Sequence, residues 1–118
     1  MVKIEELAIA VLAYDTLRAR DMIPAFFDPM LSLALVPKPK TENRELLVTS
    51  AALLELISLR RGQTPPEWTE EIGSLAQTRY LLKAAESMRR LRSLCENESP
   101  EPLRKRGLLA PPNFLEFV

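Results

Sequence analysis

Residues 44–61 read RELLVTSAALLELISLRR and are followed by Gly62. Apolar side chains fall on nearly every face of the helix that this stretch would form, which is typical of a helix surrounded by other helices. Asn43 or Thr41 precedes the stretch as a candidate N-cap, and two arginines followed by a glycine are a common helix stop signal. The sequence therefore predicts a central apolar helix over residues 44–61.

The segments before this helix predict one long helix and one short helix. Apolar residues follow the 3.6-residue period from Ile4 to Arg18, so we expect an amphipathic helix there. Asp28-Pro29 has the composition of a cap and a helix start, and Met30 to Leu35 would supply a short apolar helix. Two prolines interrupt residues 36–42, which we predict to be an exposed loop because each proline clashes with a preceding helical turn.

The segments after the central helix predict further short and long helices. Thr64-Pro65-Pro66-Glu67 has the spacing of a capping box, so we expect a short helix through Ile72. A last long helix is predicted from Thr78 to Leu94, and a short extended segment from Leu108 to Ala110. With four or five helices, the 118-residue chain is predicted to be one all-α domain, a small helical bundle around the central helix with a proline-rich basic and apolar tail over residues 99–118.

The residue types exclude several kinds of chemistry. The chain has no histidine, three glycines that stand far apart and a single cysteine, Cys95. A Ser-His-Asp triad, a zinc site and a glycine-rich phosphate loop therefore lack their parts, and we predict a protein that is not an enzyme and holds neither a cofactor nor a metal. Cys95 lies on the apolar side of its predicted helix, so we expect a small buried hydrophobe.

The sequence also carries information about the compartment. One cysteine closes no intramolecular disulfide, and the first twenty residues carry Glu5, Glu6 and Asp15, where a signal peptide needs a basic start and an uninterrupted apolar run. These features predict a cytoplasmic protein. Charges interrupt every apolar run well short of the roughly 20 residues that cross a bilayer, so we expect no membrane partner.

Positive charge is concentrated in one segment of the chain. Residues 79–106 carry a net charge of +4 and the remaining residues carry −4, so that the whole chain is neutral. On the predicted helix over residues 78–94, helical spacing would align several of these cations in a stripe. Such a stripe would neutralise phosphates, bind an acidic protein or remain a solvated face. The candidate phosphate-binding residues are Arg79, Lys83, Arg89 and Arg90.

The C-terminal tail combines cations with six large apolar residues after Gly107. Something must cover these apolar side chains, and two explanations stay open: the tail docks on the chain's own core, or it binds a partner. Trp68 is either a core residue or an interface anchor, and the core is favoured. The candidate partner-binding residues are Arg104, Lys105, Arg106, Phe114 and Phe117.

Several stretches of the C-terminal two-thirds carry a family resemblance. They are residues 51–61 with Gly62, Pro65-Pro66-Glu67-Trp68-Thr69, and Leu91-Arg92 followed by Ser99-Pro100-Glu101-Pro102-Leu103-Arg104-Lys105-Arg106. Over residues 46–118 this pattern resembles small bacterial antitoxin-like proteins, which are typically encoded beside a toxin that is often of the nucleotidyltransferase type. The resemblance implies a helical, non-catalytic protein that binds and neutralises a cognate toxin. The positions that match the pattern are Pro66, Trp68, Ser99, Pro100, Arg104 and Arg106.

These observations favour one function over two others. The leading interpretation is a protein-interaction module, antitoxin-like, that binds another protein through its basic C-terminal third and apolar tail. One alternative is a nucleic-acid-associated regulator that contacts phosphates through the basic stripe, although no aromatic residues interleave with the cations and the isoelectric point is about 6.3. The other alternative is a self-associating structural domain.

Overall fold

The central apolar stretch forms helix α3 (Arg44–Arg61) in the computed structural model, which describes residues 3–116. Both predicted end signals are confirmed. The Asn43 side chain accepts a hydrogen bond from the Leu46 backbone N–H at 3.1 Å, and Gly62 adopts a φ of 67°, a left-handed conformation that glycine tolerates best. Residues 48–58 are all buried, so α3 has protein around it on every face for about three turns.

Two helices precede α3, where the sequence predicted one helix over residues 4–18. Helix α1 (Ile4–Leu12) packs against α3, and helix α2 (Thr16–Phe26) follows after a short turn. Tyr14 in this turn has a φ of 58°, and the Asp15 side chain caps α2 by accepting a backbone N–H at 3.1 Å. The prediction was wrong because the apolar period continues across Tyr14 and Asp15. Tyr14 leaves the helical conformation, and Asp15 caps a new helix.

The segment between α2 and α3 contains only one 3-10 turn, η1 (Leu33–Leu35), in place of the helix predicted from Met30 to Leu35. The Asp28 side chain accepts a hydrogen bond from the Met30 N–H at 2.9 Å, which closes a local turn instead of capping a helix. Residues 36–42 contain neither helix nor strand, but Val36 and Pro39 are buried, so the segment is a loop that is exposed only in part.

The segment after α3 holds a 3-10 helix, η2 (Glu67–Glu71), in place of the predicted capped helix. Pro66 occupies its N-cap position and no side chain caps it, so the interpretation of Thr64 as a cap is wrong. The Trp68 side chain packs against the hydrophobic core, and its indole Nε1 donates a hydrogen bond to the Val36 carbonyl at 2.8 Å. The interpretation of Trp68 as a core residue is confirmed.

Residues 78–94 do not form the long helix that the sequence predicted. They contain strand β1 (Arg79–Tyr80), the 3-10 helix η3 (Lys83–Glu86) and the first part of helix α4 (Arg89–Glu98). Strand β1 pairs in parallel with β2 (Leu108–Leu109), the segment predicted to be extended, and the Arg79 N–H donates to the Gly107 carbonyl at 2.8 Å. This pairing between distant residues overrides the local helical pattern.

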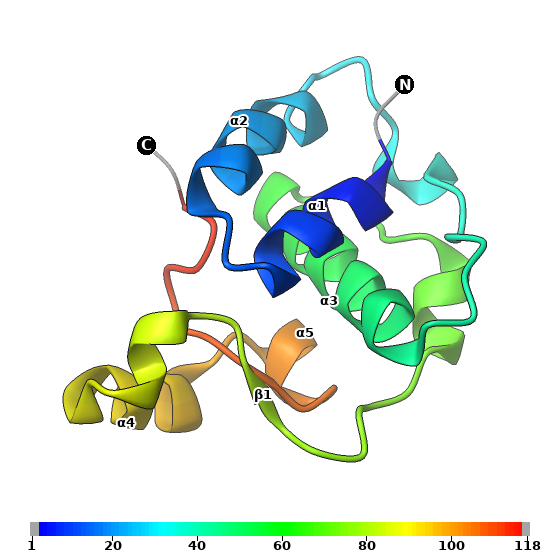
Figure 1. The fold of residues 1–118 in the computed structure, drawn as a ribbon. Helices are drawn as coiled ribbons and strands as arrows, with labels where there is room; N and C mark the ends of the chain where they lie inside the picture. Colours follow the sequence, from blue (N-terminus) through cyan, green and yellow to red (C-terminus); the bar gives the residue numbers. More distant parts are fainter. Residues whose placement is uncertain (1–2, 117–118) are drawn as a thin grey trace.

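Helix α4 lies apart from the main body of the molecule, at the lower left of Figure 1, and packs mainly against η3. The chain then returns through the short helix α5 (Glu101–Arg104), which packs on α3, and continues into β2. Within residues 3–116 the fold is therefore mostly helical, as predicted, with one small parallel sheet. No helix in this range is both long enough and apolar enough to span a membrane.

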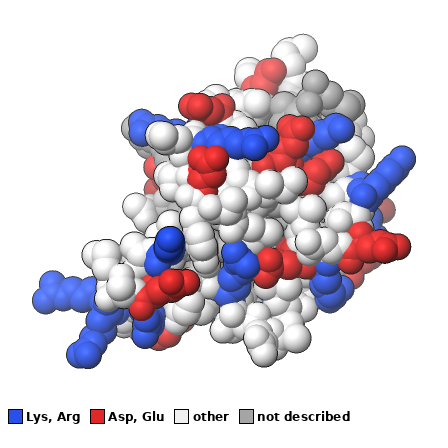
Figure 2. Space-filling model, in the orientation of Figure 1, with Lys and Arg blue, Asp and Glu red and all other residues white. Residues whose placement is uncertain are grey.

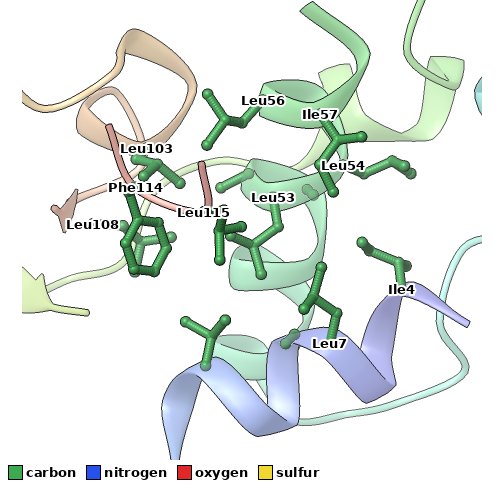
Figure 3. Close-up of a cluster of buried hydrophobic side chains, with 14 of the residues drawn as sticks. Ile4, Leu7, Leu53, Leu54, Leu56, Ile57, Leu103, Leu108, Phe114 and Leu115 are labelled. Carbon is green, nitrogen blue, oxygen red and sulfur yellow. The ribbon is translucent and has the colours of Figure 1, made fainter. Parts of the chain in front are cut away.

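The hydrophobic core lies around α3, and α1 and the C-terminal residues approach α3 from different sides (Figure 3). The tail is covered by the chain itself, because Phe114 and Leu115 are only 8% and 6% exposed. Of the two explanations for the apolar tail, docking on its own core is correct for the described residues. The side chains labelled in the close-up are Ile4, Leu7, Leu53, Leu54, Leu56, Ile57, Leu103, Leu108, Phe114 and Leu115.

Candidate functional site

Three exposed cations gather at the start of α4 and on the adjacent η3. Lys83, Arg89 and Arg90 make up this group, which we call the α4 basic surface. Lys and Arg side chains project from this part of the molecule in Figure 2. None of the three forms an ion pair with another residue of the described range 3–116, so their charges face solvent.

The charges of α4 run against the dipole of the helix. Arg89 and Arg90 occupy its first turn, at the positive end of the dipole, and no side chain caps that end. Glu96 and Glu98 lie near the opposite, negative end, where cations would be favoured. The arrangement concentrates positive potential at the start of α4 and lowers the stability of the helix.

Polar contacts hold α4 in place. The Arg92 Nε donates to the Ala85 carbonyl at 3.0 Å, and its guanidinium also bonds the Glu86 carbonyl, so Arg92 ties α4 to η3. The Tyr80 hydroxyl donates to the Glu96 carboxylate.

Cys95 is the one fully buried side chain of α4. Burial, followed by the charge of Glu96, raises the pKa of the Cys95 thiol, which therefore stays protonated and packs as the expected small hydrophobe.

Arg79 does not belong to the α4 basic surface. Its Nη1 lies 2.9 Å from the Glu45 carboxylate, its Nη2 donates to the Leu12 carbonyl at 2.8 Å, and its guanidinium lies 5.7 Å from the centre of the Tyr14 ring. The predicted stripe of Arg79, Lys83 and Arg90 on one helix face is wrong, because these residues lie in β1, η3 and α4. Arg79 instead joins α1, α3 and β1.

The predicted partner-binding cations are divided between surface and core. Arg104 is exposed at the end of α5, and the Lys105 side chain is 46% exposed. Arg106 is 2% exposed and donates to the Thr69 carbonyl at 2.8 Å and the Pro102 carbonyl at 2.9 Å. The expectation that Arg106 lies on a surface is wrong. Arg106 turns inward, whereas Arg104 and Lys105 of the same basic run stay exposed.

The two tail aromatics also need correction. Phe114 packs in the core and is not available as a surface anchor. Phe117 lies outside the described residues. Of the five candidate partner-binding residues, Arg104 and Lys105 are therefore the ones that the structure places at the surface.

Sequence analysis missed Glu55, the acid that receives the inward cations. Lys105 Nζ lies 2.9 Å and Arg106 Nη1 lies 3.2 Å from its carboxylate. Burial alone would raise the pKa of Glu55, but the hydrogen bonds and charges of Lys105 and Arg106 outweigh burial and lower it. Glu55 is the one charged residue between Glu45 and Arg60, and this was the available signal, because a charge in a buried stretch needs a partner.

No group of three or more acids and cysteines within residues 3–116 is arranged to hold a metal ion. What the surface offers chemically is a set of cations that can bind anionic groups on another molecule. Comparison with models of known protein families, with curated proteins and with solved structures found no match to this chain.

Proposed function

We propose that this chain is a non-catalytic protein-interaction module that binds an acidic surface of a partner protein through the α4 basic surface. The observation that carries the proposal is the reversed charge of α4. Arg89 and Arg90 stand at the positive end of the helix dipole with no acidic partner among the described residues, which lowers helix stability. An anionic partner that neutralises Arg89 and Arg90 would offset this loss of helix stability, which gives a reason for cations at this end of the helix.

A protein fits this surface better than a nucleic acid does. Met88 is 56% exposed between the cations of η3 and α4, so an apolar side chain lies among the charges. No aromatic residue occurs in residues 83–98 to stack on bases, and the chain as a whole carries no net charge. Arg79 pairs with Glu45, so three of the four predicted phosphate-binding cations remain available.

The resemblance to antitoxin-like proteins supports a particular kind of partner, a cognate toxin of the nucleotidyltransferase type made in the same cytoplasm. In this proposal α3 is the central helix of a small bundle and holds the surface in place. Two of the matched positions, Trp68 and Ser99, serve the fold: Trp68 bonds the Val36 carbonyl, and Ser99 accepts a hydrogen bond from the Ala110 N–H at 2.9 Å. Arg104, a third matched position, is exposed and extends the candidate contact region.

The test is co-expression with the product of the adjoining gene, followed by copurification of three forms of the chain. The wild type and a control with Lys38→Glu and Lys40→Glu are expected to retain the partner. The variant with Lys83→Glu, Arg89→Glu and Arg90→Glu is expected to lose it. The control changes two exposed cations of the 36–42 loop, so it matches the chemistry of the test variant at another site.

Two results would reject this proposal. Retention of the partner by the triple variant would exclude the α4 basic surface as the contact. A short DNA duplex that binds the wild type with an affinity falling steeply with salt, and not the triple variant, would assign the same cations to phosphates instead. Light scattering at several protein concentrations tests the remaining alternative, self-association, which would raise the measured mass as the concentration rises.

A further inference from the structure

A second surface is lined by none of the residues of the α4 basic surface. It is a cleft of about 230 Å³ between the α1–α2 turn, the residues that follow β1 and the C-terminal turn. Val11, Leu81, Leu82 and Phe114 supply apolar walls. A cleft of this size is smaller than the pockets that hold drug-sized ligands and suits one large side chain.

Two residues that line this cleft have a strained backbone. Among residues 3–116, two residues other than glycine have a positive φ, Tyr14 at 58° and Leu115 at 65°, and both line the cleft. A left-handed conformation costs a residue with a Cβ about 1–2 kcal/mol, and such strain gathers at ligand-binding sites more often than elsewhere.

Each strained residue is followed by an acid that also lines the cleft. Asp15 follows Tyr14, and Glu116 follows Leu115. Among the described residues, no lysine or arginine lines the cleft. Arg60 lies 3.8 Å from Glu116, the outer limit of an ion pair, and no cation among the described residues pairs with Asp15. The two turns therefore bring an excess of negative charge to an apolar cleft.

We infer that this cleft binds a peptide segment of a partner protein in which a large apolar side chain lies next to a positive charge. The apolar side chain enters between Val11, Leu82 and Phe114, and the charge is held by Asp15 and Glu116. This site is distinct from the α4 basic surface and does not depend on the function proposed for that surface.

The test uses three capped dipeptides, Ac-Phe-Lys-NH2, Ac-Phe-Gln-NH2 and Ac-Phe-Glu-NH2, whose second side chain is positive, neutral or negative. Binding is followed by NMR through the methyl signals of Val11, Ala19 and Leu82, all in the cleft lining. The lysine peptide is expected to bind roughly two- to fivefold more tightly than the glutamine peptide, as one exposed ion pair provides, and the glutamate peptide most weakly.

A matched variant distinguishes the contribution of the cleft's charge to peptide affinity from the contribution of its shape. Asp15→Asn with Glu116→Gln removes both charges, and asparagine caps helix α2 as well as aspartate does. In this variant the three peptides are expected to bind equally, at the affinity of the glutamine peptide. The variant with Lys83→Glu, Arg89→Glu and Arg90→Glu is expected to keep the wild-type order, which distinguishes the two surfaces.

Four outcomes overturn the inference. Shifts that do not saturate, or an unchanged order of affinities in the charge-neutral variant, would show that the cleft does not recognise this chemistry. Peptide binding that appears only after deletion of residues 117–118 would assign the cleft to the chain's own terminus. Cleft signals that move with protein concentration in the absence of peptide would assign it to a second copy of the chain.

Discussion

One carboxylate, that of Glu55, joins the residues after α5 to α3. Arg106 reaches it from the turn after α5 and also donates to carbonyls of η2 and α5, so one buried guanidinium joins three elements. Lys105 contacts the same carboxylate from a half-exposed position. The two cations should therefore contribute very differently to stability, although both touch Glu55.

Glu55→Gln is expected to lower the free energy of unfolding by about 2–3 kcal/mol, because it leaves the buried Arg106 charge without a counter-ion. Lys105→Ala is the matched control and should cost under about 1 kcal/mol, since water screens a half-exposed pair. Urea unfolding of both variants measures these values. Equal losses in the two variants would contradict the central role of Arg106.

The pH dependence of stability should carry the signature of the same carboxylate. The pKa of Glu55 is lowered from 4.5 in the folded protein, so the unfolded chain binds a proton at Glu55 first as the pH falls. The contribution of Glu55 is therefore complete above pH 4.5 and is lost as the pH falls through the folded pKa. In unfolding experiments from pH 6 to pH 3, the difference between wild type and Glu55→Gln should shrink. A constant difference would exclude this linkage.

Residue identity alone predicted some of these roles and missed others. The Gly62 stop and the Asn43 cap depend on local geometry; the stop was predicted correctly, and Asn43 was one of the two predicted cap candidates. The inward turn of Arg106 depends on Glu55, which is 51 residues away, and a charge run by itself favours a solvated surface. The strained conformations of Tyr14 and Leu115 have no local signal, because neither residue type favours a positive φ.

At the scale of elements, the bounds of a helix were predicted correctly where residues next to its two ends carry the start and stop signals. Helix α3 has the predicted bounds because capping and periodicity agree over residues 44–61. The segment 78–94 was predicted wrongly because pairing with Leu108 and Leu109 draws Arg79 and Tyr80 into a strand. Contacts between distant residues decide such segments, and they are not visible in a local pattern.

The reversed charges of α4 make a prediction about this helix. Arg89→Glu with Arg90→Glu should stabilise α4 by about 0.3–1 kcal/mol for each substitution, because acids are favoured at the start of a helix. Amide hydrogen exchange of α4 should slow accordingly. Lys38→Glu with Lys40→Glu, in a loop, should leave α4 exchange unchanged. Faster exchange in the α4 variant would show that the arginines support the helix, and would remove the main argument for a binding role.

At the scale of the whole molecule, one core holds most elements and α4 lies outside it. Burial is concentrated around α3, whereas α4 contributes Cys95 as its one fully buried side chain. Segments with few buried apolar contacts open without unfolding the rest of the protein. The amides of α4 should therefore exchange with a lower free energy than those of residues 48–58, as measured by native-state hydrogen exchange. Equal protection of both helices would contradict this division.

The parallel pairing of β1 and β2 has a consequence for how this molecule can change over evolution. Two parallel strands need a crossover between them, and here the crossover is the stretch from Leu81 to Gly107, which includes α4. The ladder fixes both ends of this stretch, and Arg106 anchors it to α3. Side chains on the outward face of α4 can therefore change without disturbing the core around α3, which carries the helix.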